Sequence, residues 1–301
     1  MASWQAILLV LALAFAPGFF WLWYFYKKDK LEPEPLGLIR NCFFLGMVVV
    51  IPAALLERAL PVSHFQSVVI VAPIVEECFK FFAILLTVYR SSQFDEPMDG
   101  VVYAAAVALG FASLENAGYL YGAYQQSSGS LATLTVLRSI LSVPAHALFS
   151  IMWGYALGVA KFTGKERGNK LITIGLLSAI GLHALFNFVA TLGPLWLLGM
   201  LILMPLMWQA GHKRIEKAMR NSRFPSPKAV ENRTLVDTGS PVTDKSVWHE
   251  NRVVVVLLMF LVCFPLGIYG LWKNSRFSLP EKVTIFVLWA LAAGAIAIQM
   301  E

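Results

Sequence analysis

Long apolar runs are the feature that most constrains what this chain can fold into. The 301 residues contain nine stretches of about 20 mostly apolar residues, the length that a helix needs to cross a bilayer. The composition agrees, because 58% of the residues are hydrophobic and 14% are charged, against ~45–50% and ~25% in soluble domains. A soluble globular domain, a disordered chain and a coiled coil are therefore excluded. The runs lie at about 4–26, 38–56, 66–89, 99–121, 137–160, 171–192, 194–210, 253–272 and 282–299.

These runs predict an all-α fold, a polytopic transmembrane helical bundle with about eight to nine spans. Only helices and closed barrels satisfy their backbone hydrogen bonds within lipid, and the runs lack the alternation of barrel strands. The run 253–272 has Pro265 and Gly267 near its middle, which permit a kink or a re-entrant turn. Whether this run crosses the membrane is therefore left open.

Basic residues predict the orientation of the spans. Lysines and arginines follow the first, third, fifth and seventh runs, whereas the loop 122–131 carries no charge. Because cytoplasmic loops are enriched in Lys and Arg, the N-terminus is expected outside a bacterial plasma membrane. Nine full spans would place the last loop outside, but this loop carries Lys273, Arg276 and Lys282. Whether the last two runs cross the membrane is therefore left open.

One long polar stretch divides the chain. Residues 211–252 are rich in Pro, Ser, Asn and basic side chains, a composition typical of flexible segments. We expect residues 1–210 to form a seven-span core and 211–252 a flexible cytoplasmic linker. Residues 253–301 would then form a C-terminal pair of hydrophobic helices.

A few ionisable and amide side chains lie inside the runs, where a charge costs ~2.5–3.5 kcal/mol on insertion scales. Such residues usually mark functional sites or helix–helix contacts. A single histidine or asparagine in a span is more often a packing group, but the conjunction of several favours a site. They are Glu76, Glu77, Lys80, Glu115, Asn116, Arg138, His146, His183 and Asn187.

Helical spacing places several of these groups on shared faces. Glu76 and Glu77 lie four and three residues before Lys80, so both carboxylates can reach its ammonium group. Adjacent residues point ~100° apart on a helix. We therefore expect one glutamate to face the chemistry and the other a structural partner. His183 and Asn187 are also four residues apart and share a face.

The depth of these groups agrees between spans of opposite direction. At ~1.5 Å per residue, Glu76, His146 and His183 are each expected ~13–15 Å below the outer surface, and Glu115 ~9 Å below it. Pro73 precedes the glutamate pair, and a second proline, at position 144, precedes His146. Each proline should free a backbone carbonyl and loosen its helix beside the site.

Buried carboxylates and imidazoles at one depth suit two functions. They can activate water, directly or through a metal, or they can relay protons or bind ions for transport. HExxH, Gly-rich phosphate loops and GxSxG are absent. Ser150 lies four residues after His146, but a serine protease would leave the glutamate pair without a role. Basic–aromatic clusters are also absent, so no nucleic-acid partner is expected.

The segment APIVEECFKFF around Glu76 resembles the glutamate-pair motif of the PrsW family of intramembrane proteases, distant relatives of the CAAX prenyl proteases. Four further segments resemble motifs of that family, in the same order, over about residues 20–210. Each motif is weak alone, but the ordered set is specific. The segments are KKDKLEPEP from Lys27, MDGVVYAAAVALGFASLENAGY from Met98, PAHALFSIMWGYALG around His146, and GLHALFNF around His183.

The resemblance implies an intramembrane endopeptidase that cuts a membrane-anchored protein near the outer face of the bilayer. By analogy with the prenyl-protease relatives, Glu76 would be the general base, with Glu77 beside it. His183 and Asn187 would stabilise the oxyanion. A transmembrane substrate of the anti-sigma-factor kind, in stress signalling, follows from the resemblance alone.

Supporting and metal-binding roles also come from the resemblance. Lys80, Glu115 and Asn116 would support the catalytic groups, and His146, His183 and Glu115 would hold a metal, with zinc as the candidate. The relatives have His where Glu115 stands and Arg one residue beyond Lys80. These departures leave metal dependence open.

Two other interpretations remain beside the protease. A proton- or ion-coupled transporter could use the same buried carboxylates. Many transporters are built from inverted repeats, but the repeat found in this sequence is only the four residues HALF, which begin at His146 and again at His183. A non-catalytic scaffold is the third interpretation, and the intact glutamate pair and histidines argue against it. The oligomeric state is not indicated by the sequence.

Overall fold

The structure, a computed structural model, describes residues 4–126, 129–222, 224, 270–278, 281–282 and 284–286. These residues form helices and turns without a β-strand, which confirms the all-α class. Contacts divide the chain into two units, Met1–Asn232 and Arg233–Glu301. The elements of the first unit are α1 (Trp4–Tyr26), α2 (Leu36–Ala59), α3 (His64–Gln66), η1 (Ser67–Val71), α4 (Ala72–Leu86), η2 (Val88–Arg90), α5 (Pro97–Gln126), α6 (Gly129–Leu137), η3 (Arg138–Ser142), α7 (Val143–Ala160), α8 (Lys165–Ala190), η4 (Gly193–Leu195) and α9 (Trp196–Arg220).

Six helices in the described residues are long and apolar enough to cross a membrane. They comprise α1, α2, α5, α8, the continuous helix Leu131–Ala160, and Gly193–Arg220. The predicted count of eight to nine spans is thus not confirmed. The expected span 66–89 corresponds to α3, η1 and α4 joined end to end. The expected runs 253–272 and 282–299 fall almost entirely outside the described residues.

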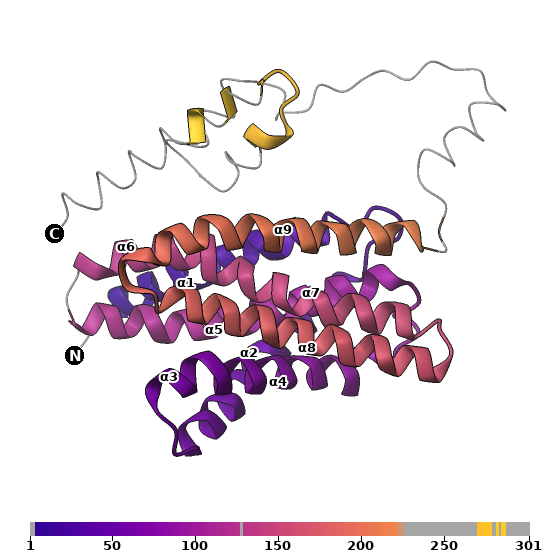
Figure 1. Cartoon of the computed structure of the whole chain (residues 1–301), viewed down its shortest axis with the longest axis horizontal. Coiled ribbons are helices and arrows are strands. Elements are labelled where there is room, and N and C mark those ends of the chain that lie inside the picture. The colour runs from indigo at the N-terminus through magenta and orange to yellow at the C-terminus, as the bar shows by residue number, and fades with distance from the viewer. Residues whose placement is uncertain are drawn as a thin grey trace. The chain divides into compact units, whose positions relative to one another are not determined.

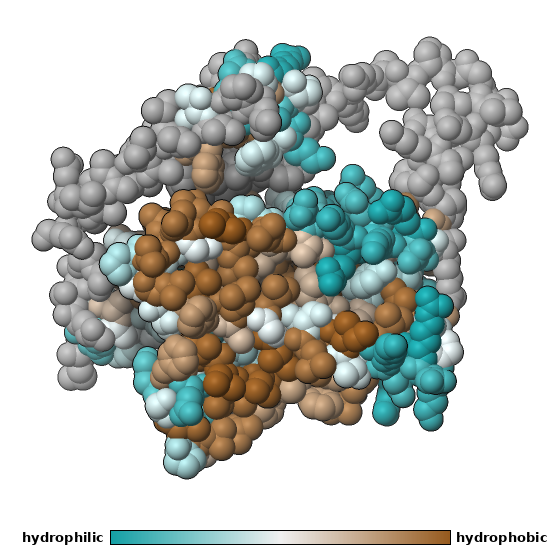
Figure 2. All heavy atoms as spheres, in the orientation of Figure 1, coloured by the Kyte–Doolittle hydropathy of each residue, from teal (hydrophilic) through white to brown (hydrophobic). Residues whose placement is uncertain are grey.

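The outward faces of the bundle are apolar. Large hydrophobic side chains are exposed on α1, α2, α8 and α9, among them Leu8, Ile51, Leu177 and Leu201. Figure 2 shows this apolar surface over the bundle, with hydrophilic residues gathered where α8 begins and α9 ends. Because such a surface suits lipid and not water, the chain is a multi-pass membrane protein.

Helix α5 forms the centre of the bundle, packed against α1, α2 and α7 (Figure 1). Every residue from 101 to 109 is at most 1% exposed. Glycines allow this close packing: a Cβ on Gly110 would lie 1.8 Å from the Phe43 carbonyl oxygen of α2, and one on Gly100 would lie 2.2 Å from the Gly154 oxygen of α7. Small residues at helix crossings are the usual device in membranes.

Two π-helical segments confirm the expected loosening next to the prolines. The segments η1 and η3 each end immediately before the short stretch that contains Pro73 or Pro144. A proline provides no N–H and clashes with the carbonyl four residues earlier, and a wider turn relieves that clash. Both segments lead directly into the helices that carry the polar residues.

Helix α9 continues ten residues beyond 210, the expected end of the core, to Arg220. The last turns of α9 bury Gly211, Ile215 and Ala218, whereas Glu216 and Lys217 are exposed. An amphipathic face of this kind prolongs the helix past the end of the apolar run. The division into core, linker and C-terminal pair remains a prediction.

Candidate active site

The glutamate pair and Lys80 lie together on α4. The Lys80 ammonium nitrogen is 2.8 Å from Glu77 Oε1 and 3.3 Å from Glu76 Oε2, and its side chain is fully buried. It also lies 4.2 Å from the centre of the Phe111 ring. The predicted sharing of one ammonium by both carboxylates is therefore present.

Glu77 is surrounded by donors. Ser150 Oγ and Trp153 Nε1 of α7 donate to Glu77 Oε2 at 2.8 and 3.0 Å. His183 Nδ1 of α8 lies 3.4 Å from Glu77 Oε1, beside the Lys80 contact. Glu77 is 0% exposed, so it joins α4, α7 and α8 and offers no free oxygen to a substrate.

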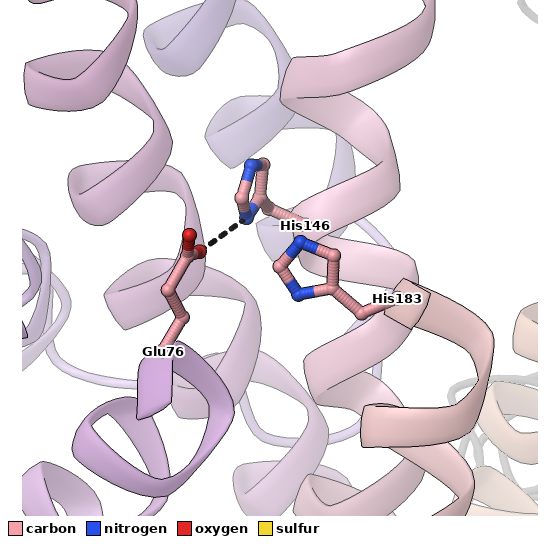
Figure 3. A group of neighbouring side chains, drawn as sticks. All are labelled: Glu76, His146 and His183. Atoms are coloured by element: carbon pink, nitrogen blue, oxygen red, sulfur yellow. Dashed lines mark ion pairs between the residues drawn. The ribbon is translucent and has the colours of Figure 1, made fainter. Parts of the chain in front are cut away.

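Glu76 is turned towards the two histidines, as Figure 3 shows. Its Oε2 lies 3.8 Å from His146 Nδ1. One ligand atom from each of Glu76, His146 and His183 lies within 4.8 Å of the other two. Glu76 is 5% exposed, and its Oε1 is neither hydrogen-bonded nor among the fully enclosed unpaired oxygens of the described residues. This carboxylate therefore keeps an accessible oxygen.

The surroundings of His146 determine its tautomer. Its Nδ1 lies 3.0 Å from Lys80 Nζ, and its Nε2 lies 3.3 Å from Glu115 Oε2. An ammonium group can only donate and a carboxylate can only accept. A neutral His146 therefore accepts at Nδ1 and carries its proton on Nε2, facing Glu115.

Glu115 and Asn116 of α5 hold Arg138 at the start of η3. Arg138 donates to Glu115 Oε2 and to Asn116 Oδ1, each at 2.7 Å. The Asn116 amide donates in turn to the Ala14 carbonyl of α1 at 3.3 Å. Glu115 therefore contacts the Glu76 group through His146, whereas Asn116 connects α5 to α1 and to Arg138.

Asn187 bonds to the backbone rather than to the histidines. Its Nδ2 donates to the Val68 carbonyl in η1 at 2.9 Å. In a π-helix that carbonyl would accept from the residue five positions later, which is Pro73 and has no N–H. Asn187 thus satisfies the carbonyl that the proline leaves free.

The structure brings together most of the residues that the sequence singles out. Asn116 and Asn187 bond away from the centre. Arg138, Ser150 and Trp153 are additions to the predicted site. The spacing contained a signal for two of them, because Ser150 and Trp153 follow His146 by four and seven residues and share its face. The residues that meet are Glu76, Glu77, Lys80, Glu115, His146 and His183.

The donor set of Glu76, His146 and His183 suits a catalytic metal. Two imidazoles and one carboxylate form a ligand combination found in zinc hydrolases. His183 Nδ1 lies against Glu77. Within the described residues, its Nε2 forms no hydrogen bond and is not among the fully enclosed unpaired atoms, so Nε2 is the nitrogen that could bind a metal. The same two histidines were expected as ligands, whereas the carboxylate that groups with both of them is Glu76 rather than Glu115.

A multi-pass helical protein with a buried Glu–His–His group belongs in the class of membrane-embedded hydrolases. A family model described as "PrsW family intramembrane metalloprotease" matches residues 34–210. The chain therefore belongs to the PrsW family of intramembrane metalloproteases, and it is a membrane protease. The expected resemblance is confirmed, and the transporter alternative finds no support.

Curated relatives agree with the family match. The relative named "Protease PrsW" from Bacillus subtilis is 33% identical over 69% of this chain and 95% of its own length. Those from Geobacillus kaustophilus and Oceanobacillus iheyensis are each 34% identical, over 71% and 72% of this chain and 93% and 99% of their own lengths. No solved structure matches the chain.

Proposed function

We propose that this protease cleaves peptide bonds of membrane-anchored proteins at the group formed by Glu76, His146 and His183. The observation that carries the proposal is the convergence of these three residues from α4, α7 and α8, with ligand atoms within 4.8 Å of one another. Glu76 would activate the attacking water, because its carboxylate keeps an accessible oxygen while Glu77 does not.

We propose zinc as the ion that Glu76, His146 and His183 would hold. When bound, zinc would polarise the substrate carbonyl and lower the pKa of water. Glu77 would orient His183 through the 3.4 Å contact to its Nδ1. Glu115 would orient His146 from the opposite side of the ring. Carboxylates that orient histidine ligands are a common outer layer of zinc sites.

A metal-free glutamate protease is the second candidate, and Lys80 is the observation that favours it. Its ammonium group already lies against both Glu76 Oε2 and His146 Nδ1, where a bound cation would be repelled. In this case Glu76 would take the proton from water directly. His183 would remain the oxyanion partner, and Asn187 would act by positioning η1.

The site predicts where the cut occurs. Glu76 and His146 lie in the first halves of α4 and α7, and His183 lies in the second half of α8, the ends that the orientation rule places towards the outside. We therefore propose cleavage near the outer face of a bacterial plasma membrane, with the N-terminus outside. A substrate of the anti-sigma-factor kind, cleaved in regulated intramembrane proteolysis, is proposed from the family resemblance.

The activity is tested with a co-expressed membrane-anchored substrate. Glu76→Gln is expected to abolish cleavage at unchanged protein level, because the amide can neither take a proton nor act as an anionic ligand. Glu166→Gln, an exposed change at the start of α8, is the matched control and should retain activity. Full cleavage by Glu76→Gln would contradict the proposed role of Glu76.

Metal analysis separates the two candidates. Purified protein should contain about one zinc per chain, and His146→Ala and His183→Ala should each lose it, because two remaining ligands hold zinc weakly. Active wild-type protein that contains no stoichiometric metal would overturn the zinc proposal and leave Glu76 as a direct base.

A further inference from the structure

Two loops that the Glu76 group does not use bring six carboxylates together. The loop between α1 and α2 and the turn that enters α5 contain the two acidic motifs of the chain. Four of these carboxylates are 0–3% exposed although they lie near helix ends: Asp29 and Glu34 at 3%, and Glu96 and Asp99 at 0%. The six residues are Asp29, Glu32, Glu34, Asp95, Glu96 and Asp99.

Part of this acidic cluster is satisfied by the protein. Asp99 Oδ2 accepts the backbone N–H groups of Asp95 at 2.6 Å and Glu96 at 2.8 Å. The Tyr103 hydroxyl donates to Glu34 Oε2, and the Ser222 hydroxyl donates to Glu96 Oε2. One oxygen each of Glu34, Glu96 and Asp99 is therefore paired.

The remaining oxygens have no donor. Asp29 is the strongest case, because both of its oxygens are enclosed and unpaired. The backbone N–H groups of Leu31 and Glu32 are near this carboxylate but fall short of hydrogen-bonding geometry. Within the described residues, the enclosed unpaired oxygens are Asp29 Oδ1 and Oδ2, Glu34 Oε1, Asp95 Oδ1, Glu96 Oε1 and Asp99 Oδ1.

Positive side chains do not compensate for the cluster. In the described part of the chain, no Lys, Arg or His forms an ion pair with any of these carboxylates. The charges of Asp99 and Asp95 act on Lys161. The Lys161 ammonium group, however, donates its hydrogen bonds to the carbonyl oxygens of Tyr89 at 2.8 Å and Ser91 at 3.1 Å.

Burying like charges in this way is unfavourable unless a cation joins them. Burial raises the pKa of Asp29 to about 7, and the neighbouring Asp99 charge adds to the rise. Burial also raises the pKa of Glu34 to about 10, and a side-chain hydrogen bond with Asp99 and the Asp99 charge add to the rise. A bound metal ion would therefore replace the proton that these two carboxyl groups share. The cluster therefore requires positive charge, either protons or a metal ion.

We propose that Asp29, Glu34 and Asp99 bind a hard divalent cation, Mg²⁺ or Ca²⁺. These ions take six or more oxygen ligands, largely carboxylates, and the cluster offers several unpaired carboxylate oxygens. Asp29 supplies two unpaired oxygens, while Glu34 and Asp99 supply one each. The cation would tie the α1–α2 loop to the start of α5.

Binding is expected to draw the carboxylates closer together. Among the described residues, the Glu76 group is the one whose ligand atoms already lie within 4.8 Å of each other. Repulsion keeps unfilled carboxylates apart, and a divalent charge reverses that repulsion. The site shares no residue with the Glu76 group, so it is independent of the proposed catalytic chemistry.

The proposal is tested by thermal unfolding of the purified full chain at pH 7.5, after chelation and with added Mg²⁺ or Ca²⁺. A ligand that binds the folded protein raises its Tm. Wild type should show this rise, whereas Asp29→Asn should lose it. Glu166→Gln removes the same charge from an exposed position at the start of α8, outside the cluster, and should keep the rise.

Two further measurements make the outcome decisive. In cation-free buffer, Asp29→Asn should be at least as stable as wild type, because it removes a buried like charge. His146→Ala disrupts the Glu76 group and should keep the Mg²⁺ or Ca²⁺ response, so failure of the zinc proposal does not affect this test. A wild-type Tm that responds to pH but not to either cation would show that the cluster holds protons, and would overturn the proposal.

Discussion

At the scale of single residues, two adjacent glutamates have opposite surroundings. Glu77 is enclosed by Lys80, Ser150, Trp153 and His183, whereas Glu76 keeps an accessible oxygen beside two imidazoles. The ~100° turn between successive helical residues produces this difference. One carboxylate builds the site, and the other is available for chemistry.

Lys80 is the residue whose removal should affect stability most. Lys80→Met leaves Glu77 and Glu76 without their shared ammonium group, and breaking a buried ion pair costs about 3–5 kcal/mol. We expect a clear fall in Tm in detergent. The double variant Glu77→Gln, Lys80→Met should recover part of the loss, since the uncompensated charge is gone. Equal stability of Lys80→Met and wild type would contradict this assignment.

The residue scale also shows where prediction from sequence ends. Glu76, His146 and His183 were predicted from the sequence because they are ionisable side chains inside apolar runs. Placing such a side chain in the membrane costs free energy, and few structural roles offset this cost. Of the partners of Glu77, Lys80 was predicted from helical spacing, whereas Ser150, Trp153 and His183 were not. Spacing shows that Ser150 and Trp153 share a face with His146, but it does not show that this face turns towards α4.

At the scale of elements, a proline and an asparagine on different helices act as a pair. Asn187→Leu should destabilise the protein by about 1–3 kcal/mol, because it leaves the Val68 carbonyl unpaired. Adding Pro73→Ala restores an N–H near that carbonyl and should reduce the loss. Thermal unfolding of both single variants and the double variant measures this coupling. Strictly additive losses would show that the two residues are independent.

The glycines of α5 allow a second test at this scale. Gly110→Ala should destabilise the bundle by about 1–3 kcal/mol, since the new Cβ would overlap the Phe43 carbonyl of α2. Gly118→Ala is the matched control in the same helix, with open space around it. It should be neutral or stabilising by about 0.5–1 kcal/mol. Similar Tm values for the two variants would contradict the close packing of α2 and α5.

At the scale of the whole molecule, apolar runs and prolines predicted the helices well, because lipid leaves the backbone little choice. The boundaries were less accurate. Helix α9 passes 210 since amphipathic turns prolong it, and the helix after 131 joins the run expected from 137. Contacts such as those of Asn116 depend on how each helix is rotated about its own axis relative to its neighbours. The hydropathy of the sequence does not indicate this rotation.

The orientation of the bundle can be measured with single cysteines. Thr163→Cys lies in the turn between α7 and α8, and Ser63→Cys lies in the turn between α2 and α3. A membrane-impermeant maleimide should label Ser63→Cys on intact cells and Thr163→Cys only after the membrane is opened. The opposite pattern would invert the predicted orientation and place the cut near the cytoplasmic face.

The ion pairs around Glu76 have a consequence for electroneutrality. Three carboxylates (Glu76, Glu77 and Glu115) face two permanent cations, Lys80 and Arg138, so the enclosed group is one positive charge short. A single proton would balance it, whereas a zinc ion would overshoot by one. Zinc uptake should therefore expel a proton or admit a hydroxide. Calorimetry in buffers of different ionisation enthalpy would count that proton, and a buffer-independent heat would exclude the exchange.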